Sequence, residues 1–245
     1  LELIKKHIKV YKNDLAIEPS AGNGAFIEGI RTLFSRYEFY DLEPEHKDIT
    51  KQNYLELEPP TANKIHIIGN PPFGRQSTLA IKFIKKSTQF CDTLSFILPK
   101  SFKKDSLKKH FPLNFHLIHE HDLPDDSFTV DNKKHNVPCV FQIWSKKDTH
   151  REVPRKLEPK NFTIVKKEIS HDISFRRVGV YAGQIDTDTV SKSTESHYFI
   201  KFNEPPTETT LDKLRNINFN SKNNTVGPRS ISKQELIHEY NNIVP

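Results

Sequence analysis

The tetrapeptide Asn70-Pro71-Pro72-Phe73 follows the apolar run 65–69 and has the residue types needed to activate a planar nitrogen. The lone pair of such an amide or amine nitrogen is delocalised into its π-system, so the nitrogen is a poor nucleophile. The Asn70 side-chain oxygen and the Pro71 carbonyl could accept hydrogen bonds from its two N–H groups and localise the lone pair. The prolines fix φ and remove donors, and Phe73 offers a flat apolar face for stacking. An ordinary loop can also contain Asn-Pro-Pro, so the tetrapeptide alone does not decide the function.

A second group of residues, 18–26, lies between a short apolar run at 15–17 and a helical pattern. A strand, a glycine turn and a helix together form the nucleotide-type site of doubly wound sheets. Gly22 and Gly24 permit a positive φ and a close approach of the backbone to a ligand. Their spacing is not G-x-G-x-x-G, which argues against a pyrophosphate site, and Glu18 favours a ligand with positive charge.

An acidic residue follows the glycines at the spacing that a ribose site requires. The segment Tyr37-Glu38-Phe39-Tyr40-Asp41 predicts a second strand that ends in a carboxylate. In dinucleotide folds an acid about twenty residues beyond the glycines binds ribose hydroxyls. Either motif could arise by chance, but both in this order indicate one ligand site beside one catalytic loop.

With both motifs present, residues 10–147 resemble the S-adenosylmethionine-dependent adenine-N6 methyltransferases of Rossmann-like fold, most closely those with the cofactor motif before N-P-P-F. The resemblance implies an α/β fold with a seven-stranded methyltransferase sheet and helices on both faces. It also implies S-adenosyl-L-methionine as cofactor and methyl transfer to the N6 amine of adenine in DNA or RNA. Residues 150–245 match no family.

The resemblance assigns roles to residues by position. Glu18 and the backbone of 20–24 would contact the methionine part of the cofactor, Asp41 would bind its ribose, and Asn53 stands where the family often has an Asp near the adenine. The predicted cofactor-binding residues are Glu18, Pro19, Ser20, Ala21, Gly22, Gly24, Phe26, Asp41, Leu42, Asn53 and Tyr54. The predicted catalytic residues are Asn70, Pro71, Pro72 and Phe73, where Phe73 replaces the commoner Tyr.

The expected partner is a nucleic acid, either single-stranded or with its target base swung out of a duplex. Lys100 and Lys103 come after a predicted strand at 93–98, where the carboxyl ends of strands form the ligand crevice, so they could contact phosphates. A solvated helix face explains each lysine equally well. Phe128 stands where the family places an aromatic that sandwiches the base, and an ordinary packing role is as good an explanation.

Composition sets the outer bounds of these predictions. The 245 residues carry a net charge of +6, and the 35% of hydrophobic residues include 17 Phe and 7 Tyr. No apolar run approaches the length that spans a membrane. The two cysteines predict a reducing compartment, and hence an intracellular location, cytoplasmic or nuclear. The 12 histidines show no ligand spacing, so no metal is expected.

The sequence predicts two domains, a catalytic domain at 1–148 and a small α+β extension at 149–245 as a candidate substrate-recognition region. Within the first, the strands are expected at 15–17, 37–41, 65–69, 93–98, 115–123 and 137–145, the last two antiparallel, with helices at 24–35, 77–90 and 102–110 and a hairpin tip or lid at 131–136. The extension is expected to contain strands at 162–165, 175–181 and 197–202 and helices at 207–216 and 232–242. Ser232 and Glu235 predict a capping box at the second helix.

Two other functions stay open at this point. A protein methyltransferase acting on the N5 of glutamine faces the same chemical problem, because a side-chain amide is also a planar nitrogen. The chain could instead be a catalytically inactive, cofactor-binding partner of another subunit. The sequence does not distinguish DNA from RNA, and it leaves the oligomeric state open.

Overall fold

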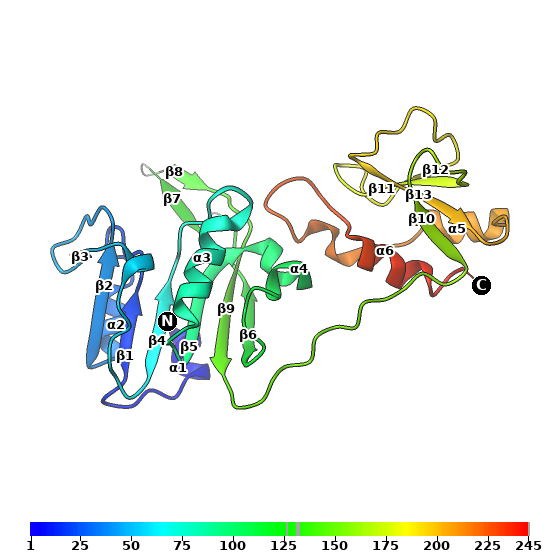
Figure 1. Ribbon diagram of the computed structural model, residues 1–245. Coiled ribbons are helices and arrows are strands. Elements are labelled where there is room, and N and C mark those ends of the chain that lie inside the picture. The colour runs from blue at the N-terminus through cyan, green and yellow to red at the C-terminus, as the bar shows by residue number, and fades with distance from the viewer. Residues whose placement is uncertain (126, 131–132, 245) are drawn as a thin grey trace. The chain divides into compact units, whose positions relative to one another are not determined.

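The computed structural model describes residues 1–125, 127–130 and 133–244. The chain divides into two compact units, Leu1–Val153 and Pro154–Pro245, which are called here the N-terminal and the C-terminal unit (Figure 1). Each is described by itself.

A seven-stranded mixed sheet forms the centre of the N-terminal unit, which confirms the predicted Rossmann-like fold class. In spatial order its strands are β3 (Thr50–Lys51), β2 (Arg36–Asp41), β1 (Leu15–Glu18), β4 (Ile65–Gly69), β5 (Thr93–Pro99), β9 (Cys139–Lys146) and β6 (Phe115–Asp122). Neighbours from β3 to β5 pair in parallel, whereas β9 runs antiparallel to β5 and β6. The central β1 and β4 are buried along their whole length, as expected for strands covered on both faces.

Helices cover both faces of this sheet (Figure 1). On one face, α1 (Glu2–His7) and α2 (Ile27–Leu33) pack their apolar residues against β-strand residues such as Ala16 and Ile68. On the other face, α3 (Thr78–Ser87) packs against Ile17, Ile67 and Leu94. Because neighbouring residues of a strand point to opposite faces, Ile67 and Ile68 belong to different cores.

The helices are shorter than the sequence predicted. The helix expected at 24–35 begins only at Ile27, because the Gly24 N–H donates to the Ala21 carbonyl and the Ile27 N–H donates to the Gly24 carbonyl, so these residues form turns. The helix expected at 102–110 is replaced by a 3₁₀ turn, Lys100–Lys103, and the single-turn α4 (Asp105–Lys108). The extended backbone of Lys104 separates the two.

Between β6 and β9 the chain forms a small ribbon in which β7 (Phe128–Val130) pairs antiparallel with β8 (Lys133–His135). The hairpin tip predicted at 131–136 therefore falls partly on β8 and partly on residues 131–132, which lie outside the described residues.

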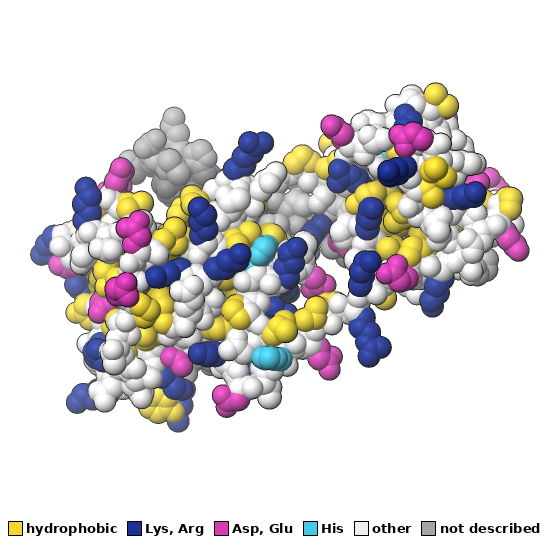
Figure 2. Space-filling view, viewed as in Figure 1, with side chains coloured by type: hydrophobic (Ala, Val, Ile, Leu, Met, Phe, Trp, Pro, Cys, Tyr) yellow, Lys and Arg dark blue, Asp and Glu magenta, His cyan; other side chains and the backbone are white. Residues whose placement is uncertain are grey.

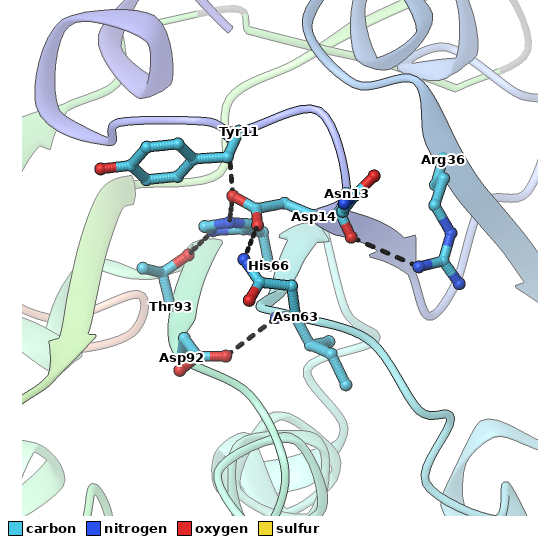
Figure 3. A network of polar contacts seen from close by, with 9 residues as sticks. Tyr11, Asn13, Asp14, Arg36, Asn63, His66, Asp92 and Thr93 are labelled. Carbon is cyan, nitrogen blue, oxygen red and sulfur yellow. Dashed lines mark hydrogen bonds and ion pairs between the residues drawn. The ribbon is translucent and has the colours of Figure 1, made fainter.

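A buried polar network joins the amino-terminal ends of β1, β4 and β5 (Figure 3). Asp14 accepts hydrogen bonds from the Tyr11 N–H at 2.9 Å and from Asn63 at 3.0 Å, and it lies 3.2 Å from His66 Nε2. The other ring nitrogen of His66 lies 2.7 Å from the Thr93 hydroxyl. Although burial acts to raise the pKa of Asp14, these hydrogen bonds hold it below its usual value. The network stabilises the amino-terminal ends of these three strands. The loops at their opposite, carboxyl-terminal ends carry the candidate site.

The C-terminal unit contains an antiparallel sheet in the order β10 (Phe162–Val165), β13 (His197–Phe202), β11 (Ile173–Arg176) and β12 (Ile185–Asp186). Its two α-helices are α5 (Glu208–Arg215) and α6 (Lys233–Tyr240), and the predicted capping box of Ser232 and Glu235 is present at the start of α6. The strand expected at 175–181 ends at Arg176, because Gly179 adopts φ +101° and turns the chain.

Among the helices that the structure describes, none combines the length and the apolar character needed to cross a membrane.

Candidate active site at the carboxyl edge of the sheet

The two sequence motifs meet at the point where the strand order of the sheet reverses. β1 and β4 are parallel neighbours, and they lead directly into the glycine turn and the Asn-Pro-Pro-Phe loop. The Ser20 hydroxyl donates a hydrogen bond to the Asn70 carbonyl at 3.2 Å. A Cβ atom on Gly69 would lie 3.2 Å from Pro19 Cδ and 3.5 Å from Glu18 Cγ. The structure thus places the motifs side by side at the switch point, where open α/β sheets bind ligands.

The turn that follows β1 has a backbone that requires glycine. Gly24 adopts φ +82°, and a Cβ atom there would lie 2.7 Å from the Ile27 side chain. Gly22 adopts φ +51°, and a Cβ atom there would meet nothing within 4 Å. The space beside Gly22 is open, so a ligand could approach the backbone at this point.

Asp41, at the end of β2, is fixed by this turn. Its Oδ2 accepts from the Gly22 N–H at 2.8 Å, and its Oδ1 accepts from the Glu43 N–H at 2.9 Å. A carboxylate oxygen can accept more than one hydrogen bond, so Asp41 retains capacity for the hydroxyl groups of a ligand. Leu42, the next residue, is 61% exposed and offers an apolar surface beside that carboxylate.

Glu18, the last residue of β1, is a buried acid with an unusual environment. Burial, and secondly the negative charge of Asp41, raise the pKa of Glu18 to about 8. Its Oε2 atom is buried and has no hydrogen-bond partner among the described residues. Leaving a buried polar atom unpaired costs about 1–3 kcal/mol, so such an atom calls for an explanation, of which a bound ligand or ion is one. A cation placed beside this carboxyl group would favour its charged form.

Asn70 shows the same feature in the catalytic loop. Its Oδ1 atom is buried and accepts no hydrogen bond from the part of the chain that the structure describes. Its backbone carbonyl is occupied by Ser20. Pro71 is buried, Pro72 is exposed, and neither has an N–H group that could occupy an acceptor nearby. The loop therefore contains a buried amide oxygen that has no hydrogen-bond partner among the described residues.

Phe73 is half-buried against the core on the α3 face, and its carbonyl accepts hydrogen bonds from the Leu79 and Ala80 N–H groups at 3.1 and 3.3 Å. Between Phe73 and α3 the chain is strained, because Gln76 and Ser77 both adopt a positive φ without being glycine. The same segment carries the exposed Arg75. Sequence reasoning missed this residue, although its position two residues after Phe73 is a signal for a cation beside the loop.

Two of the predicted cofactor-binding residues have structural roles. The Asn53 side-chain oxygen accepts from the Leu55 N–H at 3.1 Å, and its amide donates to Glu56 at 2.8 Å. These bonds cap the 3₁₀ turn Tyr54–Glu56. The Tyr54 ring is buried in the core, and its hydroxyl lies 2.8 Å from that of Ser87. Any ligand contact at this segment would therefore involve the backbone or the remaining capacity of Asn53.

Lys100 and Lys103 lie at the same edge of the sheet, but both are held by one carboxylate. Their ammonium groups lie 3.1 and 2.7 Å from Asp122, the last residue of β6. These two ion pairs lower the pKa of Asp122, although burial acts to raise it. A phosphate that bound these lysines would have to compete with Asp122.

This competition can be measured. Replacing Asp122 with Asn is expected to tighten binding of a single-stranded oligonucleotide about threefold, because partly exposed ion pairs are worth up to about 1 kcal/mol. Fluorescence anisotropy titrations at several salt concentrations would measure this change. Asp212→Asn, which removes the same charge from an ion pair with Arg215 on α5, is the matched control. Equal effects of both variants would show that only net charge matters and that the two lysines do not contact phosphate.

A cavity of about 210 Å³ lies on the α1 side of the loop and reaches Gly69, the residue before Asn70. Most of its lining is apolar, and His121 is its one titratable residue. The lining residues are Leu1, Leu3, Ile4, Phe26, Ile68, Gly69, Ile97, His121, Leu123 and Phe141. Phe26, predicted to contact the cofactor, lines this cavity, whereas Phe73 and the half-buried Phe128 do not.

Within the described ranges, no group of three or more His, Cys, Asp or Glu side chains is arranged to hold a metal ion.

No family model matches the chain, and no curated protein matches it. Several solved structures are similar to about three fifths of the chain. PH1948 of Pyrococcus horikoshii, described as a candidate RNA methyltransferase, is 17% identical, with 59% of this chain and 80% of that chain covered and a TM-score of 0.45. The 23S rRNA methyltransferase ErmE is 11% identical, with coverages of 61% and 67% and a TM-score of 0.45.

The N-methyltransferase NodS of Bradyrhizobium japonicum, in complex with S-adenosyl-L-homocysteine, is 10% identical, with coverages of 60% and 85% and a TM-score of 0.43. Identities this low, with TM-scores below 0.5, do not identify the activity of this chain.

Proposed function

We propose that the chain transfers a methyl group from S-adenosyl-L-methionine to the N6 amine of an adenine in DNA or RNA. The observation that carries the proposal is the contact between Ser20 and Asn70, which joins a glycine turn suited to the cofactor to a loop suited to a planar amine. Each side contributes one buried side-chain oxygen that has no hydrogen-bond partner among the described residues, Oε2 of Glu18 and Oδ1 of Asn70. A positively charged donor and an amine with two N–H groups are ligands that would satisfy both.

The cofactor fits the residues of the glycine turn. Bound S-adenosylmethionine supplies an electrophilic methyl group on a positively charged sulfur. Glu18 would balance positive charge on the cofactor, the backbone beside Gly22 would approach it closely, and Asp41 would accept from the ribose hydroxyls. Leu42 offers an exposed apolar surface for the adenine ring of the cofactor.

Asn70 and Pro71 would act on the amine that receives the methyl group. In the ground state the adenine amine is planar, and its lone pair is shared with the ring. Hydrogen bonds from its two N–H groups to Asn70 Oδ1 and to the Pro71 carbonyl strengthen as positive charge develops on the nitrogen. Part of the acceleration also comes from holding the two reactants together, which removes an entropic barrier.

The adenine must leave its stack to reach this loop, as in other enzymes that act on bases. Two apolar surfaces next to the loop could hold it: the partly exposed ring of Phe73, which follows the prolines, and the cavity beside Gly69. We place the base on Phe73, because stacking on an aromatic ring leaves the edge of the base, with its amine, accessible to Asn70.

Phe73→Ala is expected to raise the KM for an oligonucleotide about tenfold, since stacking of one base is worth about 1–3 kcal/mol. Ile97→Trp, which fills the cavity without touching the predicted stacking surface, is the matched control and should leave that KM unchanged. Initial rates at saturating cofactor would measure both values. An unchanged KM in Phe73→Ala together with a raised KM in Ile97→Trp would place the base in the cavity instead.

A direct test of the proposal uses cofactor labelled in the methyl group. The protein is incubated with defined single-stranded DNA, duplex DNA, RNA and a glutamine-containing protein extract, and the nucleosides are identified by mass spectrometry. Label in N6-methyladenosine or its deoxy form is the expected result, and it would also decide between DNA and RNA. Label on protein glutamine would show that the loop acts on an amide. Cofactor binding by calorimetry with no transfer of label to any substrate would indicate an inactive partner subunit.

A further inference from the structure

Two segments of the C-terminal unit, 176–185 and 222–234, contain five cations and no carboxylate. The cations are Arg176, Arg177, Lys222, Arg229 and Lys233. The segments lie side by side, because the Gly179 N–H donates to the Arg229 carbonyl and the Ile231 N–H donates to the Arg177 carbonyl, both at 2.9 Å. Residues far apart in the sequence thus form one positively charged surface, which is called here the arginine loop surface.

The ion pairs that the structure describes in this unit lie elsewhere. Lys192 pairs with Asp186, Arg215 with Glu208 and Asp212, and Lys156 with Glu158. The arginines of the surface instead donate to backbone carbonyls: Arg176 to Val178 at 2.9 Å, and Arg229 to Val180 at 3.4 Å. A carbonyl does not neutralise a guanidinium, so the charges of Arg176 and Arg229 remain available to an anion, although Asp186 and Glu235 directly follow the two segments.

The turn in this surface exposes two apolar side chains. Val180 is 75% exposed and Tyr181 is 61% exposed. The turn itself is well bonded, because the Gly183 N–H donates to the Arg176 carbonyl at 2.8 Å and the Ala182 N–H donates to the Gly179 carbonyl at 3.0 Å. Because the backbone of the turn is already ordered, a ligand that bound Tyr181 would not have to order the chain around it.

A second aromatic ring lies beside the surface. The guanidinium of Arg177 and the ammonium of Lys233 each lie 5.7 Å from the centre of the Tyr198 ring. This arrangement fixes two of the five cations against a half-buried ring. In Figure 2, lysine and arginine side chains lie among hydrophobic ones on the visible face of the C-terminal unit.

We infer that the arginine loop surface binds a single-stranded nucleic acid, with a base stacked on Tyr181 and its phosphates near Arg177 and Arg229. Proteins that bind single strands combine cations that follow the backbone with aromatic rings on which bases stack. An acidic peptide would match the charge, but it does not carry a flat ring with every negative charge as a nucleic acid does. The choice of nucleic acid among polyanions also rests on the proposed function, because that substrate has adenine bases and phosphates.

The inference is tested by fluorescence anisotropy with the full chain, labelled 12-residue oligo(dT) and oligo(U), and no cofactor. Tyr181→Ala is expected to weaken binding about tenfold, because one stacked base is lost. Arg229→Gln is expected to weaken binding and to reduce the slope of log K against log salt by about 0.7, because one phosphate contact to a single strand is lost. Both side chains are exposed, so melting temperatures should stay at the wild-type value.

Matched controls are available in the same chain. Tyr11→Ala removes an exposed tyrosine of the N-terminal unit, and Arg215→Gln removes an arginine already paired with two carboxylates. Both controls should bind the oligonucleotides as the wild type does. Wild-type affinity of Tyr181→Ala and Arg229→Gln would overturn the inference. The inference would also be overturned if these two variants lost as much affinity for labelled polyglutamate as for the oligonucleotides. That result would indicate an acidic peptide as the ligand.

These outcomes are separate from those of the proposed function. Loss of oligonucleotide binding in the two variants, with no methylation by the wild type, would support the surface and refute the enzyme. Methylation by the wild type with unchanged oligonucleotide binding in the variants would support the enzyme and refute the surface.

Discussion

Replacing Asn70 with alanine is expected to lower the rate of methyl transfer about 10³-fold while the affinity for S-adenosylmethionine is unchanged. Removing one preorganised polar group that stabilises charge in a transition state typically costs this much. The glycine turn contacts Asn70 through the backbone carbonyl, which alanine retains, so the Ser20 hydrogen bond and the cofactor side of the site should persist. Single-turnover kinetics give the rate, and calorimetry gives the affinity.

The same substitution should not destabilise the free protein. The Asn70 Oδ1 atom is buried without a partner among the described residues, so the wild type bears the desolvation of that oxygen with no hydrogen bond in return. Asn70→Ala should therefore melt at or above the wild-type temperature. A residue kept for structure would show the opposite result, a lower melting temperature with activity reduced only in proportion to the unfolded fraction. Near-normal turnover in this variant would refute the role given to Asn70.

The positions of the main strands could be predicted because the central parallel strands are nearly continuously apolar. Runs such as 65–69 and 93–98 are typical of strands buried on both faces, and the structure has strands at both. The contact of the two motifs could also be predicted, because residues that follow neighbouring parallel strands emerge at the same end of the sheet. By contrast β3 has only two residues, and so short a strand leaves no periodic pattern in the sequence.

Side-chain partners could not be predicted in this way. Whether Lys100 and Lys103 are free or paired depends on Asp122, which lies on another strand about twenty residues away and has no fixed spacing to them. Asn53 stands at the expected position, yet local backbone geometry uses its oxygen as a cap. The arginine loop surface requires residues near 177 and 229 to meet, and only the folded backbone of the C-terminal unit brings them together.

If Glu18 contacts the cofactor as proposed, the affinity for the cofactor is expected to depend on pH in a direction that the pKa of Glu18 determines. In the free protein this pKa is raised to about 8, first by burial and then by Asp41, so the carboxyl group is mostly protonated at pH 7. A positively charged ligand binds the ionised form better, so binding below pH 8 must release a proton. The affinity for S-adenosylmethionine should therefore rise as the pH increases from 6 to 8, by up to about tenfold per pH unit, and then level off.

Stability of the free protein should change in the opposite direction. The unfolded chain loses this proton near the ordinary pKa of 4.5, whereas the native protein keeps it up to about 8. The unfolded state thus binds fewer protons across that interval, and the free energy of unfolding contributed by Glu18 falls as the pH rises through it. In Glu18→Gln the side chain cannot ionise. The variant should match the wild type below pH 4, where Glu18 is protonated in both states, and be more stable than the wild type at pH 9.

The two measurements on Glu18→Gln together distinguish a ligand-binding acid from an incidental buried one. If Glu18 serves the cofactor, the variant gains stability at pH 9 and loses affinity for S-adenosylmethionine at pH 8.5. A loss of about thirtyfold or more is expected, because truncating one partner of a buried charge pair typically costs about 2–5 kcal/mol. Titration calorimetry in two buffers of different ionisation enthalpy should show proton release at pH 7 for the wild type and none for the variant. A variant that gains stability but binds the cofactor normally, with the same proton release, would show that the charge of Glu18 faces no ligand and that the glycine turn binds the cofactor through its backbone alone.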